Sequence, residues 1–92
     1  MKFMTTWSLR PGTAQEAVDR FLAGHGEPLE GAALLGRWHS IDLSIGFSLV
    51  ESSDPTAIYR NAAQWADILD LKTAVVLEDD AVGPILASVF KK

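Results

Sequence analysis

The spacing of apolar side chains along this chain switches repeatedly between a period of two and a period near 3.6 residues. A period of two puts apolar residues on one side of a strand, whereas a period of 3.6 puts them on one side of a helix. Read in order, the segments predict strand, helix, strand, strand, helix, strand and helix. This order is typical of an α+β domain and leaves few topologies open.

The predicted strands have alternating apolar residues and end at turn signals. They cover about 2–9, 33–40, 44–51 and 71–77, with a hairpin turn at 41–43. In the first strand, Phe3, Thr5 and Trp7 point one way. Gly36 and Gly46 inside strands predict bulges, or the close approach of another group to the backbone.

Strict alternation also assigns the side chains of the second strand to two faces. It places Leu35, Arg37 and His39 on one face, opposite Leu34, Gly36 and Trp38. Because one bulge reverses such an assignment, the two faces can exchange members where the strand is irregular.

Three segments have helical character. Thr13-Ala14-Gln15-Glu16 fits a capping box at the start of a helix that ends near Gly24. Asp54 is placed as the N-cap of a second helix, about 55–70, with proline at its first position. Acidic residues 78–80 precede a last helix, and Pro84 moves the expected start of its regular part to about residue 83.

Two right-handed β-α-β crossovers that share one antiparallel sheet give the ferredoxin-like β-α-β-β-α-β fold, here followed by a C-terminal helix. The prediction is one domain over 1–92, with the first and third strands at the centre of the sheet. The face away from the helices is expected to carry Met4, Arg37, His39, Gly46, Ser48 and Val50, or the set of opposite parity. A homodimer in which two such sheets face each other explains a surface of this mixed character.

Composition excludes several classes of function. Eight basic and twelve acidic side chains give a net charge of −4, which argues against nucleic-acid binding, and the terminal Lys91-Lys92 pair is no basic face. No apolar run approaches the roughly 18 residues of a membrane span. The chain has no cysteine. With no secretory signal either, it is expected to be cytoplasmic.

Metals and cofactors also lack support in the sequence. The chain has two histidines, and His39 with Asp42 is not a recognised ligand spacing. His39 can serve as an axial haem ligand, but nothing else in the sequence points to haem. No metal and no cofactor are therefore predicted.

Arg37 and His39 are the strongest chemical candidates. Residues two apart on a strand share a face, so both can reach one bound anion or carbonyl. Arginine can hold a carboxylate or enolate, and histidine can move a proton near neutral pH. The alternative is structural: Arg37 pairs with an acid such as Glu51, and His39 caps a backbone carbonyl at a dimer seam.

The tryptophans add apolar walls for a flat ligand. Trp7 and Trp38 are included in the predicted ligand-binding set with Arg37, and Ser48 joins them. Trp65 lies on the apolar stripe of its helix and is expected in the core. His25, in a glycine-rich loop, is expected to be a solvated loop residue.

Several motifs together resemble a family of small bacterial domains of unknown function, over essentially the whole chain. They are Thr6-Trp7, Pro28, Gly31, Gly36-Arg37-Trp38-His39, Glu51, Asp54-Pro55 and Trp65-Ala66-Asp67. The order of elements is similar to that of the dimeric α/β-barrel superfamily. That superfamily includes cofactor-free monooxygenases, muconolactone isomerase and haem-containing relatives, so the resemblance leaves the activity open.

Two functions therefore stand side by side. One is a small-molecule-binding protein, extending to a cofactor-independent monooxygenase- or isomerase-like enzyme, that acts on a small apolar or aromatic carbonyl or carboxylate compound. In it His39 is the catalytic acid or base and Arg37, Trp38, Trp7 and Ser48 hold the ligand. The other is a non-catalytic dimeric interaction module whose Gly-Arg-Trp-His strand forms the seam.

Overall fold

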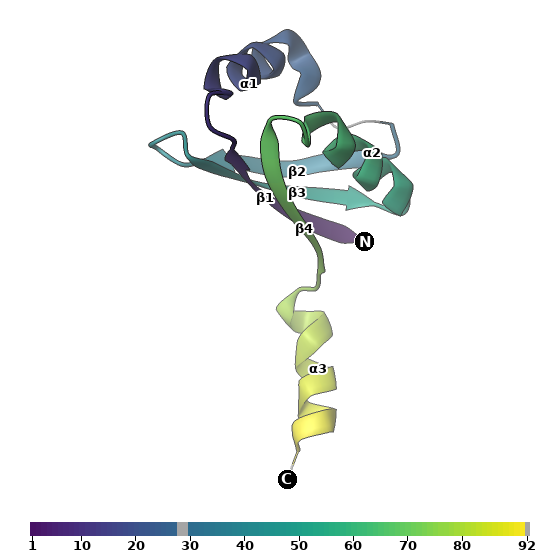
Figure 1. Cartoon of the computed structure of the whole chain (residues 1–92). Coiled ribbons are helices and arrows are strands. Elements are labelled where there is room, and N and C mark those ends of the chain that lie inside the picture. The colour runs from purple at the N-terminus through teal and green to yellow at the C-terminus, as the bar shows by residue number, and fades with distance from the viewer. Residues whose placement is uncertain (28–29, 92) are drawn as a thin grey trace.

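The computed structural model describes residues 1–27 and 30–91 of the 92-residue chain. Two residues named above lie outside the described ones: Pro28, which is part of the family resemblance, and Lys92 of the Lys91-Lys92 pair. The fold is ferredoxin-like, a four-stranded antiparallel sheet with three α-helices (Figure 1). Its elements are β1 (Lys2–Leu9), α1 (Ala14–Arg20), η1 (Phe21–His25), β2 (Ala32–His39), β3 (Ile45–Ser52), α2 (Pro55–Trp65), β4 (Leu69–Val76) and α3 (Asp79–Phe90).

The sheet order is β2-β3-β1-β4, and every neighbouring pair is antiparallel. The first and third strands are therefore central, as the predicted topology requires. Among the described residues, the buried apolar side chains are Phe3, Val50, Ala57, Ile68 and Leu69. This small core lies where the central strands and the start of β4 meet α2.

A β-bulge interrupts β2 between Leu34 and Gly36. Leu34 pairs with Val50 and Arg37 pairs with Ser48, so Leu34 lies on the same face as Arg37 and His39. The prediction that Leu34 lies opposite them is wrong, because strict alternation does not hold across an extra residue. Leu35 is that extra residue, and its side chain is exposed.

The register also decides between the two face assignments that the sequence left open. Ser48 pairs with Thr5 and Gly46 pairs with Trp7, on the face toward the helices. Arg37, His39 and Val50 share that face, whereas Met4 lies on the other. We call the other side the open sheet face; its side chains include Met4, Thr6, Trp38, Phe47, Leu49, Lys72 and Ala74. Met4, Phe47 and Leu49 make its centre largely apolar, next to the paired Thr6 and Lys72.

The helix α1 does not use the predicted capping box. The Thr13 hydroxyl donates to the carbonyls of Arg10, at 2.7 Å, and Ile68, at 3.1 Å. The Glu16 carboxylate instead accepts from Arg20. The Thr13 hydroxyl thereby links the start of the first helix to the beginning of β4. Gly24 at φ +91° ends the helical segment, as predicted.

At α2 the predicted start is confirmed and the predicted end is wrong. The Asp54 carboxylate accepts from the Thr56 N–H at 3.0 Å, with Pro55 as the first helical residue. The helix ends at Trp65 instead of residue 70. A turn follows it, in which the Ile68 N–H donates to the Trp65 carbonyl. Burial of Ile68 and Leu69 at the start of β4 favours the strand, whereas Ala66 is exposed.

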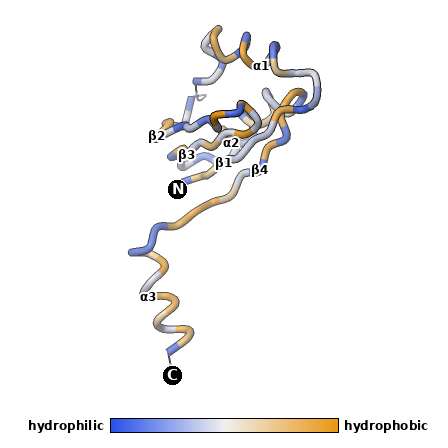
Figure 2. The backbone as a smooth tube through the Cα atoms, turned by 90° about the vertical axis from the view of Figure 1, so that its left-hand side faces the viewer, coloured by the Kyte–Doolittle hydropathy of each residue, from blue (hydrophilic) through white to orange (hydrophobic). Residues whose placement is uncertain are grey.

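The C-terminal helix α3 begins at Asp79, before the expected residue 83, and contains Pro84. The proline removes one backbone hydrogen bond, and the freed carbonyl of Asp80 lies near the exposed start of the helix where water reaches it. The helix projects away from the sheet and none of its residues is buried (Figures 1 and 2). No helix in the described ranges is long and apolar enough to span a membrane.

Candidate functional site

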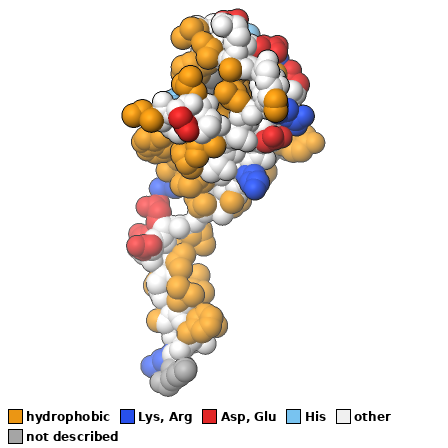
Figure 3. Space-filling view, turned by 60° about the vertical axis from the view of Figure 1, so that its left-hand side comes forward, with side chains coloured by type: hydrophobic (Ala, Val, Ile, Leu, Met, Phe, Trp, Pro, Cys, Tyr) orange, Lys and Arg blue, Asp and Glu red, His pale blue; other side chains and the backbone are white. Residues whose placement is uncertain are grey.

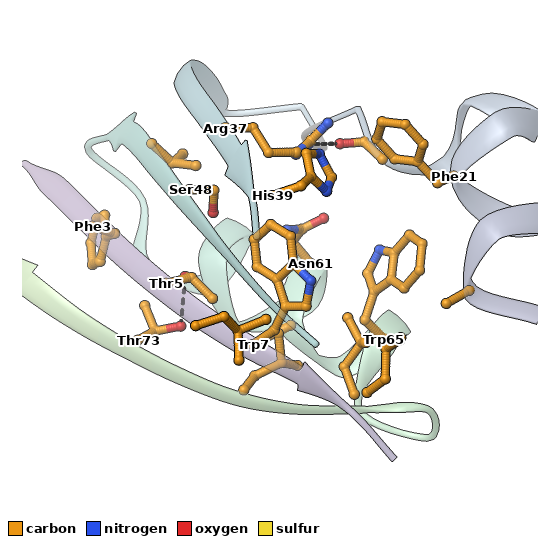
Figure 4. Close-up of a pocket in the computed structure, with 18 of the residues that line it drawn as sticks. Phe3, Thr5, Trp7, Phe21, Arg37, His39, Ser48, Asn61, Trp65 and Thr73 are labelled. Carbon is orange, nitrogen blue, oxygen red and sulfur yellow. Dashed lines mark hydrogen bonds between the residues drawn. The ribbon is translucent and has the colours of Figure 1, made fainter. Parts of the chain in front are cut away.

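A cavity of about 220 Å³ lies between the sheet and the helices α1 and α2 (Figure 4). Its floor is the helix-facing side of the sheet, with Phe3, Thr5, Trp7 and Ser48 among its residues. Ala14, Ala17, Val18 and Phe21 from α1 and η1 form one wall, and Ile58, Asn61, Ala62 and Trp65 from α2 form the other. The apolar helical stripes predicted from the sequence thus line a cavity instead of filling a core.

Arg37 projects from β2 into this cavity and is half-buried. Its guanidinium donates to the carbonyl of Gly26 and lies 5.4 Å from the centre of the Phe21 ring. The predicted pairing with Glu51 is wrong, because Glu51 lies on the other face and binds the N-terminal amine at 3.2 Å. Within the described part of the chain, Arg37 has no carboxylate partner.

His39 lies two residues further along β2 on the same face and also lines the cavity. Its ring meets Trp7 edge-on at 5.9 Å and Phe21 edge-on at 5.5 Å, measured between ring centres. Two aromatic rings thereby orient the imidazole, and no side-chain hydrogen bond engages it within the described residues. His39 does not cap a carbonyl among these residues, and its side chain is exposed.

Trp7 forms part of the cavity floor because its partner in β3 has no side chain. Trp7 pairs with Gly46, and a β-carbon on Gly46 would overlap the indole ring. The close approach predicted at this glycine is confirmed. Next to it, Ser48 is buried and contributes a hydroxyl to the same floor, while Thr5 and Thr73 hydrogen-bond each other at 2.8 Å.

Sequence reasoning missed Asn61 as a cavity residue. Asn61 is half-buried on the cavity wall (Figure 4), three residues after Ile58 and four before Trp65. The spacing puts Asn61 on the apolar stripe of the helix, where a residue normally faces apolar surroundings. A polar residue at such a position is a sequence signal for a polar group in a cavity. Phe21 also lines the cavity, and its contacts with Arg37 and His39 depend on long-range geometry.

Polar ties hold α1 over the cavity. The Arg20 guanidinium donates to both carboxylate oxygens of Asp67, at 3.0 and 2.6 Å, and to the Gln64 carbonyl at 3.2 Å. It also binds Glu16 at 2.9 Å and lies 5.9 Å from the Trp65 ring centre. The hydrogen bonds from Arg20 hold the pKa of Asp67 below its usual value. The wall formed by α1 is therefore linked to the end of α2 by charge.

The remaining candidates lie elsewhere. Trp38 is on the open sheet face, 56% exposed, and does not line the cavity. Its indole lies over Gly36, which confirms the close approach predicted there. His25 is exposed at the end of η1, outside the cavity. Trp7, Arg37, His39 and Ser48 are thus brought together, and Trp38 is separated from them by the sheet.

The cavity combines a mainly apolar wall with one cation, one imidazole and a few neutral polar groups. This donor set matches an organic anion or carbonyl compound with an apolar body. No group of three or more histidine, cysteine, aspartate or glutamate side chains converges on a point anywhere in residues 1–27 and 30–91.

Comparison with known proteins gives a family without an assigned activity. The family model described as "Domain of unknown function (DUF3303)" matches residues 1–90. No curated protein matches the chain. Among solved structures, the crystal structure of PA3566 from Pseudomonas aeruginosa is similar, with 17% sequence identity, a TM-score of 0.48, and coverage of 84% of this chain and 93% of that one.

Proposed function

We propose that this chain, which belongs to the DUF3303 family of unknown function, binds a small aromatic or apolar compound carrying a carboxylate or carbonyl group. The observation that carries the proposal is the projection of Arg37 and His39 into one apolar cavity walled by tryptophan. A cation on an apolar wall attracts a ligand that has both an oxygen anion and a hydrophobic body.

Arg37 is the group that holds the ligand oxygen. Its guanidinium has five N–H donors, and the Gly26 carbonyl occupies part of this set, so donors remain for a ligand. The apolar surroundings lower the local dielectric, which strengthens a hydrogen bond between the guanidinium and an anion. Holding Arg37 by a backbone carbonyl also fixes its direction without neutralising its charge.

The size of the cavity limits the ligand. A cavity of about 150 Å³ accommodates benzene. The cavity here is about 220 Å³, which leaves room for one ring and a short substituent. Trp7 and Trp65 supply flat surfaces against which such a ring packs.

Ligand binding is tested by titrating the protein with benzoate and phenylacetate in a calorimeter. Arg37→Gln is expected to weaken carboxylate binding about 10- to 100-fold, the cost of losing a charge-assisted hydrogen bond. Arg60→Gln is the matched control, because Arg60 is exposed on α2 outside the cavity, and it should bind as the parent does. Equal affinities for the parent and Arg37→Gln would refute the role of Arg37.

For catalysis, we propose proton transfer by His39 next to a ligand carbonyl. The imidazole removes a proton from the carbon adjacent to the carbonyl, and Arg37 stabilises the enolate oxygen that forms. The step needs no cofactor, since the proton returns from the same imidazole to the enolate. It corresponds to the isomerase-like side of the superfamily that the sequence resembles.

This step is tested by following deuterium exchange from solvent into the methylene group of phenylpyruvate by NMR. The parent should speed the exchange above the buffer rate, and His39→Gln should lose about 10²- to 10⁴-fold of that acceleration. His25→Gln is the matched control and should exchange at the parent rate. If the parent gives the buffer rate while benzoate still binds, the protein is a binding protein and the catalytic role of His39 is wrong.

A second function is favoured by the open sheet face. Met4, Trp38 and Phe47 are exposed there to 41%, 56% and 37%. Contiguous exposed apolar residues of this kind mark interaction surfaces. We propose that this face forms a homodimer with the same face of a second copy. The Gly-Arg-Trp-His strand then serves both functions, with Arg37 and His39 toward the cavity and Trp38 toward the partner.

A further inference from the structure

Beyond the ion pair of Lys2 with its N-cap Glu78, the helix α3 packs little against the rest of the described chain. It is 12 residues long, has no buried residue and projects from the end of β4, which makes the longest dimension of the molecule 54 Å. An isolated helix shorter than about 12–15 residues is marginal in water. Figures 1 and 2 show no other described element packed along it. A surface outside this chain that covered the helix would therefore stabilise it.

One side of α3 is suited to packing. The apolar residues Val82, Ile85, Leu86, Val89 and Phe90 recur at the spacing of one helix face. We call this set the α3 stripe. Val89 is 68% exposed and Phe90 71% exposed. The opposite side carries small or polar residues, among them Ala87 and Ser88. Figure 3 shows hydrophobic side chains along the projecting helix as well as on the body of the domain.

We propose that α3 is an arm that packs on a second copy of this chain, next to that copy's open sheet face. The inference rests on the homodimer proposed above and adds to it an exchanged element. In a two-fold arrangement each copy gives one α3 stripe and receives the other, so both sets of exposed apolar residues are covered at once.

The area of the open sheet face supports this arrangement. Four strands of eight residues, at about 4.8 Å between strands and about 3.3 Å per residue, give a footprint on the order of 500 Å². A stable interface buries about 800 Å² from each partner. A 12-residue helix, about 18 Å long and about 10 Å wide, adds a footprint on the order of 200 Å². The sheet alone falls short of a standard interface, and α3 brings it near that size.

The way α3 leaves the domain fits the same partner. Only Leu77 and Glu78 separate β4 from α3, and Lys2 forms an ion pair with Glu78 at the start of the helix. This short, anchored link directs α3 beyond the end of its own sheet (Figure 1).

Charge also distinguishes a second copy from a membrane surface. The first turn of α3 carries Asp79 and Asp80, and the chain has a net charge of −4, which opposes binding to anionic lipid. A second copy supplies complementary charge, since Lys72 on its open sheet face has no carboxylate partner among the described residues.

The first arm of the test measures dimer dissociation of the full chain by analytical ultracentrifugation. The double substitution Ile85→Glu with Val89→Glu puts charge on the α3 stripe and should raise the dimer Kd at least about tenfold. Ala87→Glu with Ser88→Glu adds the same charge on the opposite side and should leave the Kd unchanged. Equal Kd values for the two double variants would overturn the inference, while a dimeric parent would still support the sheet-to-sheet homodimer.

The second arm locates α3 on the partner. The chain has no cysteine, so Ala87→Cys gives one attachment point for a spin label. In a mixture of spin-labelled copies and isotope-labelled parent copies, the label should broaden amide signals of the open sheet face of the parent copies. Broadening confined to signals away from that face would overturn the inference. A monomeric parent at tens of micromolar would overturn both the dimer and the arm, and would leave the ligand titration unaffected.

A third arm tests the membrane as occupant, using phosphatidylcholine vesicles. The parent should not co-sediment with them. Vesicle binding by the parent that the Ile85→Glu, Val89→Glu variant loses would overturn the inference in favour of a lipid surface.

Discussion

Each face of the sheet carries a tryptophan ring that lies over a glycine, but the surroundings of the two rings differ. On the helix side Trp7 lies over Gly46, and on the open side Trp38 lies over Gly36. In each case the glycine allows an indole ring to lie flat on the strand. Trp7 is half-buried beneath α1 and α2, whereas Trp38 is 56% exposed. The role of each ring therefore depends on its surroundings. A ring covered by helices forms the floor of a cavity, and a ring left uncovered forms part of an interaction surface.

The strand β2 is the element that serves both faces. Because side chains alternate along a strand, Arg37 and His39 point to the cavity while Gly36 and Trp38 point away from it. One four-residue run therefore contributes to two surfaces on opposite sides of a single sheet. The predictions below test whether the two surfaces are independent.

The largest effect is expected from Gly46→Ala. A methyl group at this position overlaps the Trp7 ring, whose movement is limited by the helices above it. Such overpacking should lower the free energy of unfolding by on the order of 2 kcal/mol and weaken benzoate binding. Gly36→Ala is the comparison, measured at protein concentrations below the dimer Kd. No helix of the same chain covers Trp38, so its ring can move aside in the monomer and the cost should stay below about 1 kcal/mol. Urea unfolding measures both values, and equal costs would contradict the difference between the faces.

The next effect separates ligand binding from dimerisation. Trp7→Ala removes an aromatic wall of the cavity and should weaken benzoate binding about tenfold, with the dimer Kd unchanged. Trp38→Ala should give the reverse result, a dimer Kd raised about tenfold and unchanged benzoate affinity. Calorimetry and ultracentrifugation on both variants provide the measurement. If one variant impairs both properties equally, the two faces are not independent.

Sequence reasoning predicted the order of elements and the central strands, because hydrophobic periodicity is local and strong. The close approach at Gly36 and Gly46 was also predictable, since a glycine inside a strand is unusual. The bulge at Leu35 was not, because nothing in the sequence distinguishes Leu34 from Leu35 as the extra residue. That bulge is why Leu34 lies on the same face as Arg37 and His39.

The site itself was predictable only in part. The pairing of Arg37 with His39 follows from strand geometry, but which layer they face depends on the whole sheet. Parity left both sides of the sheet open for these two residues, and the register places them under α1 and α2. Contacts such as Phe21 with His39 join elements far apart in the chain and have no local signal.

A smaller effect is expected from the tie between α1 and α2. Asp67→Asn removes the negative charge that Arg20 binds and loosens the cavity wall. Because Asp67 is exposed and Arg20 keeps Glu16 and the Gln64 carbonyl as partners, global stability should change little. Amide hydrogen exchange should become faster in α1 but not in β1. Gln15→Ala is the control, because the hydrogen bond of the Gln15 side chain goes to Asp19 of the same helix and not to α2. Equal acceleration in both variants would contradict the tie.

The smallest effect concerns the hairpin between β2 and β3. Hydrogen bonds from the Ser44 hydroxyl and N–H and the Ser40 hydroxyl lower the pKa of Asp42 from 3.8 to about 2. A lowered pKa means that the folded state favours the ionised form, so this stabilisation is present above pH 3.8 and is lost as the pH falls through about 2. NMR titration of the Asp42 carboxyl carbon measures the midpoint, and a midpoint near 3.8 would contradict these hydrogen bonds.

The central claim is that ligand and partner use opposite faces of the sheet, and the three indole N–H signals test it most directly. We predict that titration with benzoate, monitored by two-dimensional ¹⁵N NMR, shifts the signals of Trp7 and Trp65 and leaves that of Trp38 in place. A shift of Trp38 with Trp7 and Trp65 unmoved would contradict the account.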